Sequence, residues 1–284
     1  MPHPHSLHDA TVTLVDGAIE SLRQGTDEQA VHLARKSCKR VRAALRLLRA
    51  GLGEREYRLD NRRVRDSARP LTAVRDAIML PQTLGRLTKH PQPLERDLEA
   101  DYHRARQALA RRGARTAIEQ LRDTRARLTK ITSVDCEVAS AVAGAKSVYR
   151  AGRKALGKAR SRQDKALHEW RKQSQYLLNQ LELLRSIYNV GFKKLHRRAK
   201  RIAEALGDDH DLSVLSSKLR PGEACERPVG KHIEKRRRKL QARAFRHGKR
   251  LYRHSAKHFE GLLVAHLSQA QLWSTSARGA TNGH

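Results

Sequence analysis

The chain has 284 residues, and 60 lysines and arginines against 29 aspartates and glutamates give it a formal net charge of +31 at pH 7. Aromatic residues make up 4% of the chain, too few for the surfaces of a typical all-β domain, and no run of about 18 apolar residues exists to span a membrane. Such a charge surplus disfavours the compact state by self-repulsion unless something negative offsets it. The composition therefore predicts a polyanionic partner, which at this stage is nucleic acid, polyphosphate, an anionic membrane surface or an acidic protein.

Helical patterns fill the chain. Ser6 and Thr26 each stand where a helix would begin, with Asp9 and Gln29 three residues later able to reach back as in a capping box. Apolar residues then recur at intervals of three and four, and no segment alternates with period two for long enough to form a strand, so the predicted fold class is all-α. We predict helices over residues 27–51, 54–68, 70–80, 94–112, 114–130, 135–160, 164–187, 191–206 and 229–252, with a short piece after Gly207.

Prolines mark the expected interruptions of this pattern. Pro70 is expected to break or kink the helical stretch that begins near Glu54, because proline lacks the amide hydrogen and its ring clashes with the preceding turn. Pro81, Pro91 and Pro93 are expected to bracket a loop.

The two halves of the chain resemble each other. Residues 32–49 pair with residues 168–185, and residues 57–76 pair with residues 192–211, at a spacing of about 135 residues that is too long for a solenoid repeat. Duplication of a helical bundle is the better interpretation, and it predicts two bundles of about four helices related by a pseudo-twofold axis. The predicted organisation is one compact domain over residues 6–270, with repeats at about 6–130 and 135–270 and flexible tails at 1–5 and 271–284.

Cations line one face of two successive helices. On the first helix a row lies opposite the apolar positions and comprises His32, Arg35, Lys36, Lys39, Arg42 and Arg46. On the next helix the row comprises Arg58, Arg62, Arg65 and Arg69, and the second half repeats it as Lys193, Arg197 and Lys200. Like charges three or four residues apart repel and weaken a helix, so their recurrence in one register favours a polyanion-binding groove over the alternative, a merely solvated basic face.

Histidines and cysteines offer other chemistry. His32 and His168 occupy equivalent positions in the two halves. Each can be interpreted as a packed side chain or as a hydrogen-bond donor to phosphate. A metal ligand is the least favoured interpretation, since neither histidine has a carboxylate or cysteine at i+3 or i+4. Cys38, Cys136 and Cys225 lie far apart, which argues against a disulfide framework and a structural zinc site. Because the first residues also lack a charged-then-apolar leader, we expect a protein of the reducing cytosol.

Two motifs recur in order in both halves. The first is His32–x–x–Arg35–Lys36–x–x–Lys39–Arg40–x–Arg42, matched by His168–x–x–Arg171–Lys172. The second is Leu71–x–x–Val74–Arg75–Asp76, matched by the segment Leu206 to Leu212 that contains His210 and Asp211. With these motifs, residues of about 6–270 resemble the conserved histidine α-helical domain (CHAD) family.

The resemblance implies two four-helix bundles around a basic cavity that binds inorganic polyphosphate, without catalytic activity, cofactor or metal. The candidate polyphosphate-binding residues are the two cation rows together with Arg40, Arg75, His168, Arg171, Lys172, His210 and, on the long basic helix, Arg237. Whether that last helix faces the groove is not readable from the sequence. The second repeat departs from the basic pattern, because Gln175, Tyr176 and Leu178 stand where the first repeat has Lys39, Arg40 and Arg42.

Three functions compete. Rows of arginine and lysine suffice to hold polyphosphate, which carries charge on every unit and no bases, so its binding is the leading hypothesis. Sequence-independent nucleic-acid binding is the alternative, although single-strand binders usually add exposed aromatic platforms that this chain hardly offers. An enzyme acting on phosphoanhydrides would need clustered carboxylates for Mg²⁺, and acidic residues are scarce on the basic faces. We expect a cytoplasmic protein; attachment to polyphosphate granules and any protein partner stay open.

Overall fold

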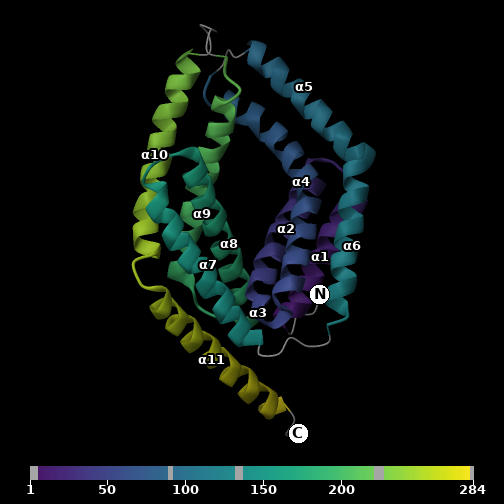
Figure 1. Ribbon diagram of the computed structural model, residues 1–284, viewed down its shortest axis with the longest axis vertical. Coiled ribbons are helices and arrows are strands. Elements are labelled where there is room, and N and C mark those ends of the chain that lie inside the picture. Colours follow the sequence, from purple (N-terminus) through teal and green to yellow (C-terminus); the bar gives the residue numbers. More distant parts are fainter. Residues whose placement is uncertain (1–5, 89–91, 132–136, 221–226, 282–284) are drawn as a thin grey trace.

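The computed structural model describes residues 6–88, 92–131, 137–220 and 227–281, and within these ranges all regular secondary structure is helical, which confirms the predicted all-α class (Figure 1). None of the helices in these ranges is long and apolar enough to cross a membrane. The elements are α1 (Leu7–Gln24), α2 (Glu28–Leu47), α3 (Arg49–Leu52), α4 (Glu54–Gly85), α5 (Gln92–Ala108), a π-helical turn η1 (Leu109–Gly113), α6 (Ala114–Thr129), α7 (Glu137–Ala159), α8 (Asp164–Tyr188), α9 (Lys193–Ser216), α10 (Arg227–Leu251) and α11 (Ala256–Thr281).

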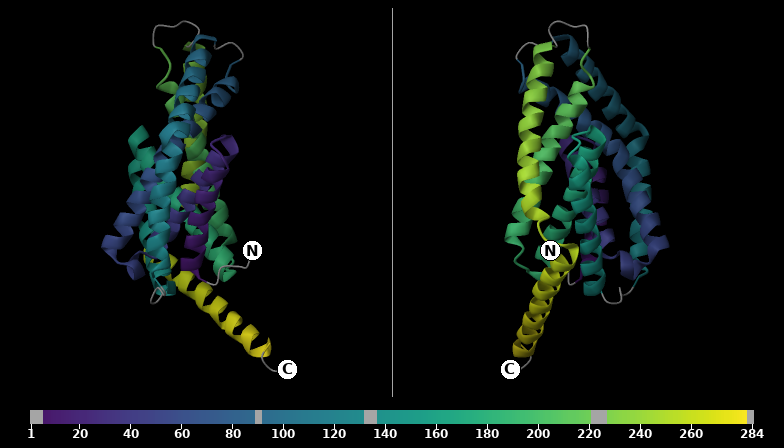
Figure 2. Two further views of the ribbon diagram at one scale, coloured as in Figure 1. Left: turned by 90° about the vertical axis from the view of Figure 1, so that its right-hand side faces the viewer. Right: turned by 60° about the vertical axis from the view of Figure 1, so that its left-hand side comes forward.

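The helices group into two halves along the chain. In the first half α1 packs on α2, α2 on α4, α4 on α5, and α6 returns to α1; in the second half α7 packs on α8, α8 on α9, α9 on α10, and α11 returns to α7. The halves differ at their ends, because α6 also packs on α4 whereas α11 projects away from the bundle (Figure 2). The order of neighbours thus agrees with the predicted duplication, and the pseudo-twofold axis stays a prediction.

The core confirms the apolar face predicted for the first basic helix. Val31, Ala34, Cys38, Val41 and Leu45 of α2 are all buried, since α2 lies between α1 and α4 of its own half and α7 and α8 of the other. One continuous cluster of buried apolar residues runs through both halves. The two halves therefore fold around a shared core.

The contact between α2 and α7 is unusually close. A Cβ atom on Gly144 of α7 would lie 2.2 Å from the carbonyl oxygen of Arg46 and 2.7 Å from the Cα of Leu47, so only glycine fits there. Next to it, the Ser140 hydroxyl donates to the Leu47 carbonyl at 2.9 Å and accepts from the Gly51 amide at 3.1 Å. These contacts bring the backbones of α2 and α7 together and fix the position of the second half relative to α2.

A second, smaller core joins the far ends of four helices. It consists of Leu80 and Leu84 of α4, Leu94 and Leu98 of α5, Leu212 and Leu215 of α9, and Val229 and Ile233 of α10. The halves are consequently held together at two places, by α2 against α7 and α8 and by this distal cluster. The residues of the candidate site lie between them, beginning one turn before Leu80 and immediately before Leu212.

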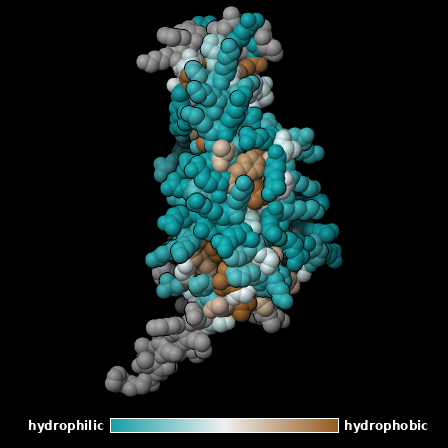
Figure 3. All heavy atoms as spheres, turned by 90° about the vertical axis from the view of Figure 1, so that its left-hand side faces the viewer, coloured by the Kyte–Doolittle hydropathy of each residue, from teal (hydrophilic) through white to brown (hydrophobic). Residues whose placement is uncertain are grey.

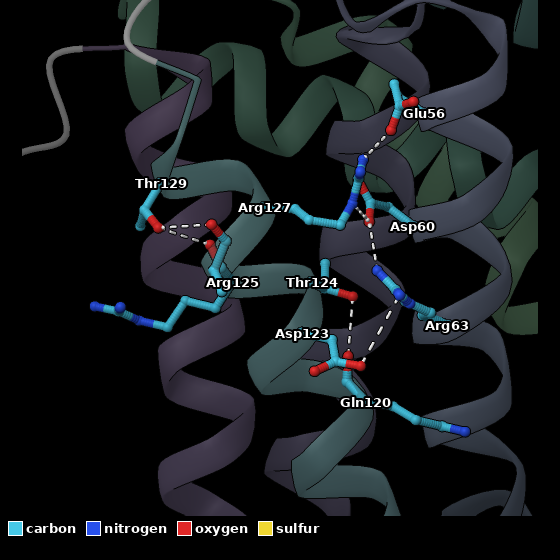
Figure 4. A network of polar contacts seen from close by, with 10 residues as sticks. Glu56, Asp60, Arg63, Gln120, Asp123, Thr124, Arg125, Arg127 and Thr129 are labelled. Atoms are coloured by element: carbon cyan, nitrogen blue, oxygen red, sulfur yellow. Dashed lines mark hydrogen bonds and ion pairs between the residues drawn. The ribbon is translucent and has the colours of Figure 1, made fainter.

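Ion pairs complete the attachment of α6 to α4 (Figure 4). Asp60 of α4 is fully buried, and Arg127 of α6 donates to it from Nε at 3.0 Å and from Nη2 at 3.2 Å. Arg127 also pairs with Glu56, one turn earlier on α4. Arg63 lies between Asp60 and Asp123, 4.0 Å and 3.9 Å away. Because Asp60 is buried, this pairing is required to keep its charge from being left uncompensated.

Several predicted boundaries are wrong. Pro70 does not break the helix, since α4 continues through it and through Pro81 to Gly85. The packing of α4 along α2, α5, α6 and α9 outweighs the lost backbone hydrogen bond, which costs about 3 kcal/mol in an isolated helix. Likewise α9 continues past Gly207 to Ser216 without the predicted separate piece.

The helix starts also differ in part from expectation. Ser6 caps α1 as predicted, accepting from the Asp9 amide at 3.0 Å. The cap of α2 is Asp27 rather than Thr26, because its carboxylate accepts from the Ala30 amide at 2.8 Å. The expected tail at 1–5 lies outside the described residues, as do 282–284, whereas α11 extends through Thr281.

Candidate functional site

Four helices from both halves direct charged side chains to one place between the two cores. We define this central cluster as Arg35 and Lys39 of α2, Arg75 and Asp76 of α4, His168 and Arg171 of α8, and His210 and Asp211 of α9. Arg75 bridges the halves, because its Nη1 and Nη2 donate to the two Asp211 oxygens at 2.6 and 2.7 Å and Nη1 also donates to Asp76 at 3.0 Å. Both carboxylates of the cluster thus pair with Arg75 rather than with its other cations.

The other cations of the central cluster have no such partner. Within the described ranges Arg35 donates only to the Thr72 hydroxyl, at 3.3 Å, and neither Lys39 nor Arg171 has an ion pair with a carboxylate. Burial, and then the neighbouring Arg75, lowers the pKa of Arg35 to about 10. Burial, followed by Arg35 and Arg171, lowers the pKa of Lys39 to about 7, and burial likewise lowers the pKa of Arg171.

These shifts share one physical cause. A partly buried cation loses hydration, and neighbouring cations add repulsion that two carboxylates do not cancel. An anion placed among Arg35, Lys39 and Arg171 would relieve both penalties at once. The central cluster is therefore arranged to receive negative charge.

Two histidines form one wall of this cluster. The rings of His168 and His210 lie 5.1 Å apart, and the pKa of His210 is lowered to about 4 by burial and then by Arg171. Burial and Arg171 also lower the pKa of His168. Both rings are thus neutral at neutral pH and can each donate one hydrogen bond to an anion. The equivalent His32 is exposed near the start of α2.

A pocket of about 320 Å³ opens beside these histidines. Arg237 of α10 lies at its edge, so the long basic helix does reach the site. However, Arg237 donates to Asp209 at 3.0 Å and also pairs with Asp164, which leaves little of its charge for a ligand. Its main effect is to hold α10 against α8 and α9.

Further along α2, Arg42 and Arg46 are held by neutral groups. Both donate to the Asn61 side-chain oxygen of α4, at 3.1 and 3.2 Å. The Arg46 guanidinium lies 3.6 Å from the ring centre of Tyr176 in α8, and Arg42 lies 5.6 Å from it. Amide and ring contacts orient these cations without cancelling their charge, and burial lowers the pKa of Arg46.

The remaining candidates are mostly at the surface. Those that are exposed are Lys36, Arg58, Arg62, Arg65, Arg69, Lys172, Lys193, Arg197 and Lys200. Some have acidic neighbours, for example Arg65 with Asp66 at 2.9 Å and Lys172 with Glu169. Arg40 is partly buried, and its Nε has no hydrogen-bond partner in the part of the chain described.

The exposed rows on α4 and α9 lead to the central cluster. Arg65 and Arg69 precede Thr72 and Asp76 by seven residues, which is two helical turns on one face. On α9 the row through Arg197 and Lys200 continues by the same register toward Asp211, although Glu204 interrupts it. The candidates thus form a buried centre with two exposed approaches.

Sequence reasoning missed several members of the site. Asp76 and Asp211 were available from the repeat, since the two aspartates align with each other, but their role in holding Arg75 was not predicted. Tyr176 was taken only as a lost cation. Nothing in the sequence reveals that Asn61 and Tyr176 meet the same two arginines.

Other chemistry finds little support in the ranges described. Cys38 is buried, and burial raises the pKa of its thiol to about 12; Cys136 and Cys225 lie outside those ranges. His254 and His258 stack with ring centres 4.3 Å apart. In the described segments no three His, Cys, Asp or Glu side chains are grouped so as to hold a metal ion.

A comparison with protein families matches the model of the CHAD domain to residues 9–220. The chain belongs to the CHAD family. The matched range runs from α1 through α9 and includes every candidate residue except Arg237. The crystal structure of the CHAD domain from the plant Ricinus communis is similar, with a TM-score of 0.52, 18% identity, and coverage of 94% of this chain and 93% of that chain. At this identity the likeness shows the fold, and a search of curated proteins found no match.

Proposed function

We propose that this CHAD protein binds inorganic polyphosphate at the central cluster and performs no reaction on it. The observation that supports the proposal most directly is the meeting of Arg35 and Lys39 from one half with Arg171 from the other, partly buried and without carboxylate partners in the described chain. Folding brings these cations together at an electrostatic cost that only an anion offsets. Family membership supports the same ligand, since polyphosphate binding is what the resemblance to CHAD proteins implies.

Polyphosphate fits the shape of the site better than a compact anion. It is a linear polymer with charge on every unit, and the exposed rows on α4 and α9 extend the central cluster in a line over further turns. Arginines such as Arg65 and Arg197 on these rows offer planar forks suited to phosphate oxygens. A single phosphate would leave both rows without a role.

Nucleic acid is the weaker candidate. Binding of single strands usually relies on aromatic rings that stack on bases. The rings of Tyr57, Trp170 and Tyr176, on helices that carry the cations, are all buried, and Tyr176 is already covered by Arg46. Phosphate contacts alone would give nucleic acid weaker binding than a polymer with no bases.

The absence of catalysis is likewise a proposal supported by the carboxylates. Cleavage of a phosphoanhydride would use acidic residues to hold Mg²⁺. Asp76 and Asp211 are the acids nearest the unpaired cations, and both are committed to Arg75. We further propose that the protein is cytoplasmic and associates with polyphosphate granules, which imaging of a fluorescent fusion in polyphosphate-accumulating cells tests.

The test is a competition between long-chain polyphosphate and single-stranded DNA of equal charge for the protein. Polyphosphate should bind more tightly, and EDTA should have no effect. By analogy with single-stranded nucleic acid, six contacts would give a log–log salt slope of about −4. Arg35→Ala with Arg171→Ala should abolish most of the binding, whereas the matched exposed pair Arg111→Ala with Arg112→Ala should not. Tighter binding of DNA, loss of binding with EDTA or equal losses from both pairs would refute the proposal.

A further inference from the structure

A second basic pocket lies on the outside of the second half, away from the residues of the central cluster. It has a volume of about 520 Å³ and lies between α7 and the carboxyl end of α10. We define this outer pocket by its lining cations, Arg150, Arg153, Lys154, Arg160 and Lys249, together with Leu156, Gly157, Tyr252 and Ala256. Figure 3 shows the side of the molecule that carries α10, which is hydrophilic apart from small apolar patches.

The charge of the outer pocket is uncompensated. None of its lining residues is acidic, and no ion pair joins its five cations to a carboxylate in the described parts of the chain. The only acid of α7 is Glu137, at the opposite end of the helix, where it accepts from the Leu7 and His8 amides. Some exposed arginines elsewhere do have an acidic neighbour, as Arg58 has Glu54 on α4.

Three of the five cations share one face of α7. Arg150, Arg153 and Lys154 are three and four residues apart, a spacing at which like charges repel and weaken a helix. From Arg150 to Ala159, the last residue of α7, the helix rises about 14 Å at 1.5 Å per residue; Arg160 follows in the turn after it, and Lys249 contributes from α10. Five cations over this length match an anion of several phosphates rather than one.

The outer pocket is closed on its inner side by tightly packed residues and is open between its cations. Tyr252 and Leu156 are largely buried, and Tyr252 is wedged against Gly152, where a Cβ atom would lie 2.3 Å from its hydroxyl oxygen. The Tyr149 ring packs against Tyr252 with ring centres 5.1 Å apart. At Gly157 an added Cβ would meet no atom within 4 Å, so the space between the cations is unobstructed.

We propose that the outer pocket is a second binding site, specific for condensed phosphates of a few units such as inorganic tripolyphosphate or a segment of a longer chain. It acts independently of the central cluster, with which it shares no residue. Its arginines bind phosphate oxygens in pairs, and the lysines supply point charges along the chain.

The experiment is calorimetric titration of the full-length chain with tripolyphosphate at one low salt concentration. The triple variant Arg153→Ala, Lys154→Ala and Arg160→Ala removes three charges from the pocket. A matched triple, Arg111→Ala, Arg112→Ala and Arg115→Ala, removes three exposed charges elsewhere. The central pair Arg35→Ala with Arg171→Ala separates this proposal from the proposed function.

We expect two sites in the wild-type chain and in the matched triple. In the pocket triple the affinity of one of the two sites should fall at least about tenfold, so that only the other site is detected. The reason is that hydrogen bonds to charged groups contribute roughly 1.5–3 kcal/mol each. If the pocket triple binds like the matched triple, the outer pocket is not a site. If the variant of the central pair loses all binding, the outer pocket is not a site and the proposed function stands. If that variant binds like the wild type and the pocket triple loses all binding, the outer pocket is a site and the proposed function is refuted.

A measurement on the unaltered protein guards against misfolded variants. Tripolyphosphate should slow acylation of Lys154 and Lys249 severalfold, while exposed Lys235 and Lys130 should react at unchanged rates. Equal protection of all four lysines would show general screening and would overturn the proposal.

Discussion

Binding of polyphosphate should depend on pH through Lys39. The unliganded side chain has a pKa of about 7, because burial removes hydration and because cations surround it: Arg35 on its own helix, Arg75 on α4 and Arg171 on α8, with Asp211 on α9 as the opposing charge. A bound anion would restore the pKa toward the ordinary value of 10.5. The protein must then take up a proton at Lys39 whenever it binds polyphosphate above pH 7.

The size of the effect follows from the two pKa values. With about 7 in the free protein and 10.5 in the complex, proton linkage makes the affinity about 50-fold weaker at pH 9 than at pH 7, and changes it only about twofold between pH 6 and pH 7. His168 and His210 do not contribute above pH 7, since their pKa values are lowered and both remain neutral. The arginines stay largely charged up to pH 9, including Arg35 with its lowered pKa of about 10.

The assay is titration with long-chain polyphosphate, whose internal phosphates are ionised throughout, at one ionic strength from pH 6 to pH 9. Lys39→Met should bind more weakly at pH 7 and show a nearly flat profile above it. Lys36→Met, which alters the exposed neighbour on the same helix, should retain the wild-type slope. A wild-type profile that is flat from pH 7 to pH 9, or a slope that survives in Lys39→Met, would refute the assignment of Lys39 to the anion site.

Three further predictions concern matched pairs. Arg171→Ala should weaken polyphosphate binding about tenfold or more, whereas exposed Lys172→Ala should change it less than threefold, because Arg171 lies in the central cluster and Lys172 pairs with Glu169; titration at one salt concentration decides, and equal losses would contradict the placement. Asp60→Ala should lower the free energy of unfolding in urea by about 3 kcal/mol, because it leaves Arg127 without its buried partner. The exposed control Asp123→Ala should lower it by under about 0.5 kcal/mol. A small effect at Asp60 would show that the network does not attach α6. Gly144→Ala should destabilise by about 1–3 kcal/mol through its clash with the α2 backbone, whereas Gly157→Ala, with open space around it, should stabilise slightly; thermal unfolding measures both, and a neutral Gly144→Ala would show that α2 and α7 can separate.

Much of the fold was predictable because it depends on periodicity. The apolar positions of α2 from Val31 to Leu45 predicted which face of this helix is buried. The opposite face was therefore predicted to carry the cations. The family motifs were also local, and they located the region in which Arg35, Arg75 and Arg171 meet. What periodicity cannot supply is the energy of packing against a distant helix, and for this reason the predicted break at Pro70 was wrong.

The arrangement within the site required the structure. The aligned aspartates Asp76 and Asp211 look equivalent in sequence, yet both serve one arginine, Arg75, since the halves face each other across it. This leaves Arg35 and Lys39 from one half and Arg171 from the other without a carboxylate partner in the described part of the chain. A pattern along one chain does not show such pairing, because it depends on which helices the fold places opposite each other.

Tyr176 offers the last prediction, because it is one of the three positions at which the second repeat departs from the basic pattern. Its buried ring lies under the Arg46 guanidinium, 3.6 Å from the ring centre, and a cation–π contact of this kind contributes about 0.5–2 kcal/mol. Tyr176→Leu should therefore free Arg46 and weaken polyphosphate binding about three- to tenfold, whereas Tyr176→Phe keeps the ring face and should bind like the wild type. Polyphosphate titration at one salt concentration and urea unfolding of both variants separate binding from stability. If Tyr176→Leu loses stability but binds like Tyr176→Phe, Arg46 serves the fold alone; if it binds more weakly, the tyrosine of one repeat orients the arginine of the other toward the ligand.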